Sequence, residues 1–118
     1  PIDPRDIAAV AARALVDAER HRGGRYVLTG AQPMTTAQQV ETLARVLGRP
    51  IKHVPVPLAG ARAGMLQSGM PEMMADAILE LVSGNSGDPF VTTHVKDVVG
   101  REPHSFESWA TSNAAHFA

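Results

Sequence analysis

Apolar residues recur at helical spacing near the start of the chain, which predicts an amphipathic helix there. The stripe consists of Ile7, Val10, Ala11, Ala14, Leu15 and Ala18. Asp3 is placed to cap this helix, with Pro4 at its first position and Asp6 closing a capping-box-like pair. Gly23 and Gly24 predict its end. Because many residues of the stripe are alanines, we expect the helix to pack closely against a neighbour.

Two short apolar segments that flank a helical stripe predict a strand, a helix and a second strand. The strands are residues 25–29 and 51–56. Thr35 and Gln38 form a capping pair at the start of the intervening helix, and Gly48 ends it. This order is typical of a parallel βαβ unit with a right-handed crossover. Because a two-stranded parallel sheet is rarely stable by itself, we expect its open edges to need a partner.

Helical spacing returns in the second half of the chain. The elements predicted there are helices at residues 58–68, 72–82 and 93–99, an extended segment at 90–92 and a last helix from Ser105. A break at residues 69–71 separates the first two helices, and residues 83–89 form a loop. Thr93 and Ser105 are placed as helix caps. The whole pattern predicts a single, mostly helical α/β domain over residues 1–118, with two or three short strands.

The composition is that of a globular chain without thiol chemistry. Hydrophobic residues make up 44% of the 118 residues, and the lack of cysteine excludes disulfides, thiolate nucleophiles and cysteine-based metal sites. Basic and acidic residues are interspersed and give a net charge of -1, which disfavours a nucleic-acid partner. No apolar run approaches the ~20 residues of a membrane span. We therefore expect a soluble, cytoplasmic protein that binds neither nucleic acid nor membrane.

Motifs for nucleotide, redox or metal chemistry are incomplete in this chain. It contains no G-x-G-x-x-G dinucleotide fingerprint. Gly64 and Gly69 have the spacing of a phosphate-binding loop, but Met70 stands where that loop requires lysine. Tyr26 is followed four residues later by Gly30 and not by the lysine of a Tyr–Lys acid/base pair. The five histidines lack zinc-motif spacing. We predict no catalytic residue, metal site or cofactor site within the chain.

A cluster of methionines is the feature that points to a ligand. Met65, Met70, Met73 and Met74 gather where two predicted helices meet, and methionine adapts to irregular apolar partners. We predict that they contact an apolar or aromatic small molecule through shape and not through bond making. The outer candidates for this substrate-binding site are Phe90 and His53. The alternative is a deformable core between the two helices.

Five segments, taken in order, resemble the C-terminal part of NmrA-like and related atypical short-chain dehydrogenases. They are residues 2–8 (IDPRDIA), 26–30 (YVLTG), 34–50, 54–57 (VPVP) and 98–107 (VVGREPHSFE). Gln38 stands where that family usually has an acid, and Val99 stands where it has threonine. The resemblance runs along essentially the whole chain, and the order and spacing of the segments are more specific than any one of them.

The resemblance implies the substrate-side lobe of an NAD(P)-dependent oxidoreductase of the quinone- or azo-reductase kind. In that family an N-terminal Rossmann domain binds NAD(P), and no such domain is present in this chain. The cofactor and the catalytic residues would then lie upstream of Pro1, and the chain alone would be inactive. The missing domain, or self-association, would cover the open strand edges.

Two other interpretations stay open at this point. The resemblance also includes redox-sensing regulators, so the chain could be a non-enzymatic regulator or a protein-interaction module. A third interpretation is a complete, independent protein with a small-ligand pocket of its own.

Overall fold

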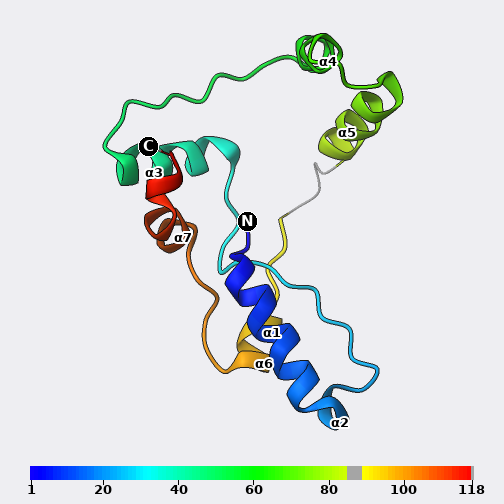
Figure 1. Cartoon of the computed structure of the whole chain (residues 1–118), viewed down its shortest axis with the longest axis vertical. Coiled ribbons are helices and arrows are strands. Elements are labelled where there is room, and N and C mark those ends of the chain that lie inside the picture. The colour runs from blue at the N-terminus through cyan, green and yellow to red at the C-terminus, as the bar shows by residue number, and fades with distance from the viewer. Residues whose placement is uncertain (85–88, 118) are drawn as a thin grey trace. The chain divides into compact units, whose positions relative to one another are not determined.

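The computed structural model describes residues 1–84 and 89–117, and helices dominate it (Figure 1). The chain forms two compact units. Unit 1 is Pro1–His53 together with the chain from Phe90 onward, and unit 2 is Val54–Pro89. No helix in the described residues is long and apolar enough to cross a membrane. The expectation of one domain over residues 1–118 stays a prediction.

Unit 1 is built from two pairs of packed helices. Its helices are α1 (Pro4–Val16), α2 (Ala18–His21), α3 (Thr36–Leu47), α6 (His94–Val99), α7 (Phe106–Ser112) and the 3-10 helix η1 (Ala114–Phe117). Helix α1 packs against α6, and α3 packs against α7 (Figure 1). Val10 of α1 and Val95 and Val98 of α6 form a buried cluster. The side chains that pack around this cluster are Ile2, Tyr26, Leu28 and Val99.

The predicted helix caps are confirmed, and they explain where the helices begin. Asp3, Thr35 and Ser105 each accept a backbone N–H from the first turn of their helices. Gln38 completes a capping box with Thr35. Gly48 ends α3 in the left-handed region, at φ 61°, where glycine has no steric penalty.

The cap predicted before α6 differs in detail. Thr93 holds the N-cap position but makes no capping bond to the helix backbone. Its hydroxyl donates instead to Oδ2 of Asp97, over 2.7 Å. Helix α1 also ends earlier than Gly23: the backbone of Asp17 leaves helical geometry (φ −116°, ψ 56°), and α2 continues to His21.

The buried face of α1 is not the one that the apolar stripe predicts. Asp6 and Val10 are its buried residues, whereas Ile7 is 45% exposed and Leu15 is 81% exposed. The prediction that Asp6 closes a capping-box-like pair is therefore wrong. Asp6 faces inward because polar partners from far along the chain bind it there, and this turns the stripe partly toward solvent.

The predicted strands at residues 25–29, 51–56 and 90–92 are not seen, because the described residues contain no strand. Side chains, and not a backbone ladder, link the first and third of these segments. The hydroxyl of Thr92 donates to the carbonyl of Val27 over 2.6 Å, and the Thr92 amide donates to Thr29 Oγ1 over 3.0 Å. The Val27 amide bonds His94 Nδ1 over 2.9 Å. The expected βαβ unit and its α/β class are thus replaced by helices joined by extended connections.

Unit 2 consists of two helices, as the sequence predicts. They are α4 (Leu58–Gln67) and α5 (Glu72–Gly84). Gly69 makes the turn between them with φ 87°, and Ala75 of α5 is fully buried. Nε and Nη2 of Arg62 donate to the Asp76 carboxylate over 2.6 and 3.0 Å, which ties α4 to α5. Part of the predicted loop at 83–89 lies outside the described residues.

Candidate functional site

The start of α1 carries a carboxylate that is almost fully enclosed. Asp3 is 4% exposed and accepts hydrogen bonds from the backbone amide of Arg5 over 2.8 Å and from Arg5 Nη2 over 2.6 Å. The hydrogen bonds from the Arg5 side chain hold the pKa of Asp3 below its usual range, against the opposing effect of burial. Asp3 is therefore a paired anion that fixes the first turn of α1.

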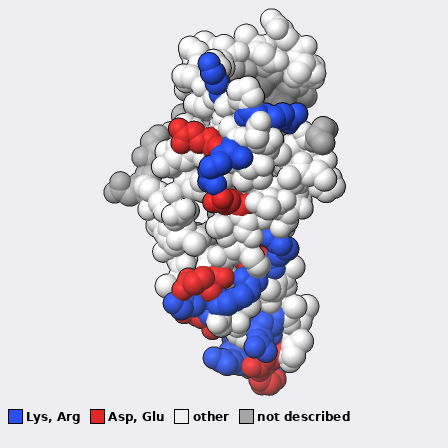
Figure 2. Space-filling view, turned by 90° about the vertical axis from the view of Figure 1, so that its left-hand side faces the viewer, with Lys and Arg blue, Asp and Glu red and all other residues white. Residues whose placement is uncertain are grey.

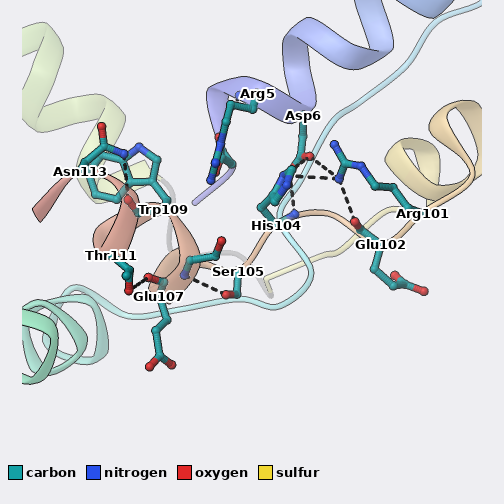
Figure 3. A network of polar contacts seen from close by, with 12 residues as sticks. Arg5, Asp6, Arg101, Glu102, His104, Ser105, Glu107, Trp109, Thr111 and Asn113 are labelled. Carbon is teal, nitrogen blue, oxygen red and sulfur yellow. Dashed lines mark hydrogen bonds and ion pairs between the residues drawn. The ribbon is translucent and has the colours of Figure 1, made fainter.

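Asp6, one turn further on, joins this helix to the segment that follows α6 (Figure 3). Its side chain is fully buried, and Oδ1 accepts from Arg101 Nη1 over 2.8 Å and from His104 Nδ1 over 2.7 Å. Oδ2 accepts from the backbone amide of His104 over 2.7 Å. Burial acts to raise the pKa of Asp6, but the bonds from Arg101 and His104 outweigh it and lower that pKa. The buried group is thus an ionised carboxylate.

A cleft of about 230 Å³ lies beside this cluster in unit 1. The residues that line it are Pro1, Ile2, Asp3, Pro4, His104, Phe106 and Trp109. Phe106 and Trp109 stack with ring centroids 5.4 Å apart, and the edge-to-face contact of Phe117 supports Trp109 from another side. The cleft therefore combines aromatic and aliphatic walls with one imidazole and the paired carboxylate of Asp3, which suits a small aromatic molecule with a polar group.

A second hollow of about 250 Å³ adjoins the cleft and shares Asp3, Pro4 and Trp109 with it. Arg5 and Asn113 are among its other lining residues. The Asn113 amide donates to the carbonyl of Trp109 over 2.8 Å, and this bond belongs to the polar network of Figure 3. Trp109 thus contributes to both hollows.

Charge on the surface is mixed. On the face drawn in Figure 2, basic and acidic side chains lie next to one another. The ion pairs of the described residues include Arg45–Glu107 and Lys96–Glu102. The described residues contain no group of three or more His, Asp or Glu side chains that could hold a metal ion.

The six residues predicted to bind substrate fall into both units. The four methionines belong to unit 2, where the amide of Met70 donates to the carbonyl of Met65 over 3.1 Å and both side chains are half-buried. Met73 is 84% exposed and Met74 is 54% exposed. His53 and Phe90 belong to unit 1 and are exposed, Phe90 by 68%. That these residues form one ligand site stays a prediction.

Sequence reasoning did not select the residues of the cleft. It assigned Asp6, the partner of His104, to a capping pair, and it gave no functional role to His104 or Trp109. One signal was present: Asp6 and His104 lie in the first and the last of the five segments that resemble the dehydrogenase family. Two such segments at opposite ends of a chain can be in contact in the fold, as these two are.

Comparisons with known proteins find NAD(P)H-dependent reductases among the proteins to which the chain is similar. No family model matches it. It is 38% identical over 98% of its length to the NAD(P)H azoreductase of Xenophilus azovorans, and covers 41% of that protein. It is 32% identical over 99% of its length to the (4-alkanoyl-5-oxo-2,5-dihydrofuran-3-yl)methyl phosphate reductase of Streptomyces griseus, and covers 42% of it. The chain thus spans about two fifths of the curated relatives it matches.

A solved structure shows the same fold. The chain superimposes with a TM-score of 0.73 on the Citrobacter sp. triphenylmethane reductase complexed with NADP(H). The sequence identity is 22%, and the match covers 96% of this chain and 39% of that chain. The chain is therefore similar over its whole length to the C-terminal part of NAD(P)-binding reductases, and it has the fold of that part.

Proposed function

We propose that the chain is the substrate-side part of an NAD(P)H-dependent reductase that acts on aromatic compounds. The observation that carries this proposal is the 38% identity to an NAD(P)H azoreductase over 98% of the chain, which runs through both units. The azo- and triphenylmethane reductases among its relatives are named for dyes built on aromatic rings. The chain's methionines offer apolar contact of the kind that such rings need.

The cofactor belongs to residues outside this chain in this proposal. The sequence lacks the glycines that let a backbone approach a pyrophosphate, so NADPH has no fingerprint to bind here. Met65, Met70, Met73 and Met74, with Phe90 and His53 at the margin, would line the substrate side through shape and apolar contact. The chain alone would then be inactive.

The exposed segment at the start of unit 2 supports a docking role toward a cofactor domain. Val54 and Val56 alternate along this extended segment and are 72% and 60% exposed. Alternation of apolar residues is the pattern of a half-buried strand, and an unpaired strand edge recruits a partner. We propose that this segment pairs with the sheet of a dinucleotide-binding domain, in a cytoplasmic protein.

A chimera tests the function directly. The C-terminal part of the Xenophilus azovorans azoreductase that matches this chain is replaced by residues 1–118, and NADPH-dependent bleaching of an azo dye is measured. We expect the chimera to bleach the dye, and we expect no bleaching from the truncated azoreductase or from the chain alone. Saturable binding of micromolar NADPH by the chain alone would contradict the assignment of the cofactor to other residues.

A second candidate is a non-enzymatic regulator or interaction module. The observation in its favour is the apolar end of α1, where Leu15 and Val16 are 81% and 83% exposed. Such a surface suits self-association or protein docking. Light scattering of the purified chain distinguishes the two: a concentration-dependent dimer supports this role, and a strict monomer counts against it.

A further inference from the structure

His104 is held in one tautomer by the buried carboxylate of Asp6. Its Nδ1 lies 2.7 Å from Asp6 Oδ1, and an ionised carboxylate can only accept a hydrogen bond. The proton of a neutral imidazole must therefore be on Nδ1. Arg101 Nη1 lies 3.3 Å from the same ring nitrogen because both groups donate to Oδ1. The other ring nitrogen, Nε2, then carries a lone pair.

His104 is partly exposed and lies at the cleft. Asp6 is completely buried and holds the Nδ1 edge of the ring, whereas 31% of the His104 side chain is exposed. The same side chain lines the aromatic cleft. Among the residues that the structure describes, none makes a hydrogen bond to Nε2. One lining residue of the cleft thus carries a hydrogen-bond acceptor that has no partner in the described residues, whereas the other ionisable lining side chain, Asp3, is already paired with Arg5.

The size and the walls of the cleft select the kind of molecule that fits. An apolar cavity of about 150 Å³ is enough for benzene. The cleft here measures about 230 Å³, which leaves room for one substituted aromatic ring or a small fused pair. Phe106 and Trp109 present aromatic surface to such a ring, with the aliphatic atoms of Ile2 and Pro4 close by.

We propose that this cleft binds a phenol, whose hydroxyl donates to Nε2 of His104 while its ring packs against Phe106 and Trp109. Asp6 is the positioning residue, because it fixes the tautomer that makes Nε2 an acceptor. The proposal concerns unit 1 alone. It goes beyond the reductase assignment, because every lining residue of the cleft belongs to unit 1 and none of them is a residue predicted to bind the reductase substrate.

Binding by the unmodified chain provides the first test. Trp109 is the only tryptophan, so its indole N–H signal in a ¹H–¹⁵N spectrum reports on the cleft without ambiguity. The titrations use phenol and toluene at pH 8, where a phenolic hydroxyl with a pKa of about 10 keeps its proton. We expect saturable shifts with phenol and an affinity about five-fold or more above that of toluene, as one made hydrogen bond provides. Equal affinities, or no shift with tens of millimolar phenol, overturn the proposal.

The imidazole itself provides the second test. Long-range ¹H–¹⁵N spectra report which ring nitrogen of His104 carries the proton. We expect Nδ1–H in the free chain and a change at the Nε2 resonance when phenol binds. A free chain in which Nε2 carries the proton, or a bound state that leaves Nε2 unchanged, contradicts the proposed contact.

A variant pair separates the hydrogen bond from general apolar binding. His104→Leu should remove the preference for phenol over toluene, and His116→Leu, an exposed histidine in η1, should retain it. A preference that survives in a folded His104→Leu chain overturns the role of His104. If that variant does not fold, the phenol and toluene titrations of the unmodified chain still decide the question.

Discussion

Arg101 Nη1 donates a 2.8 Å hydrogen bond to Oδ1 of Asp6. This bond ties α1 to the segment between α6 and α7, and the two residues are 95 positions apart in the sequence. The Asp6 side chain is fully buried, whereas 40% of the Arg101 side chain is exposed. The negative charge of Asp6 is therefore buried, and the partly exposed guanidinium of Arg101 neutralises it. The backbone amide and Nδ1 of His104 donate the other two hydrogen bonds to the carboxylate.

Replacing the carboxylate of Asp6 by an amide should destabilise unit 1. In Asp6→Asn the amide NH2 faces the donors of Arg101 and His104, so bonds are lost inside the fold without a change of volume. We expect a loss of about 2–3 kcal/mol in the free energy of unfolding, measured by urea denaturation. Glu19→Gln, which removes an exposed ion pair with Arg22, should change little. Equal stability of the two variants would contradict the role of Asp6.

The chain should lose stability at acid pH, because two buried, paired carboxylates become protonated there. The pKa values of Asp3 and Asp6 are lower in the folded state than the ordinary value of 3.8, so the unfolded chain takes up protons first as pH falls. Their contribution to stability is then complete above about pH 5 and is lost progressively below about pH 4. Urea midpoints measured between neutral and acid pH check this. The acid slope should be shallower in Asp3→Asn and Asp6→Asn, and unchanged slopes would refute the prediction.

Gly30 should not tolerate a side chain. A Cβ added there would lie 2.0 Å from the carbonyl oxygen of Pro1, and backbone must move to admit it. We expect Gly30→Ala to destabilise unit 1 by about 1–3 kcal/mol, because the displaced segment carries Ile2 away from the valine cluster. Gly64→Ala is the matched control: it has open space in α4 and should stabilise that helix by about 0.5–1 kcal/mol. Thermal unfolding of both variants measures the difference.

Removal of the Thr92 hydroxyl should lower the stability of unit 1. Thr92→Val keeps the shape of the side chain but removes the bond to the Val27 carbonyl. We expect a loss of about 1–2 kcal/mol and faster hydrogen exchange at the Val27 amide, whose bond to His94 depends on the same contact. Thr111→Val removes an exposed hydroxyl bond within α7 and serves as the control. Unaltered exchange at Val27 would show that side chains do not hold these segments together.

Local signals in the sequence predicted the helices well. Thr35 and Gln38 lie three residues apart at the start of the helix they cap, and Gly48 ends that helix because glycine adopts the left-handed region without a steric penalty. These features need no tertiary information. The strand predictions were wrong because strands depend on tertiary information. A strand depends on a neighbour for its backbone bonds, and residues 25–29 find Thr92 and His94 side chains in place of another strand.

The candidate site could not be predicted from local patterns. Asp6 follows the cap residue Asp3 by three positions, where an acid predicts a capping-box-like pair, and its actual partners Arg101 and His104 lie close to the other end of the chain. The methionine cluster, by contrast, is visible in the sequence because its members are neighbours there. Clustering in the sequence does not show whether the side chains are buried, and Met73 is 84% exposed.

Unit 1 is closed by contacts between its own two segments, since Asp6 binds His104 and Arg45 of α3 pairs with Glu107 of α7. Unit 2, from Val54 to Pro89, lies between those two segments in the sequence. It is therefore an insertion, and loop-closure entropy rises by only about 0.6 kcal/mol for each doubling of an insertion's length. A change in the length of residues 54–89 should therefore cost unit 1 little stability, because none of the contacts that close unit 1 passes through them.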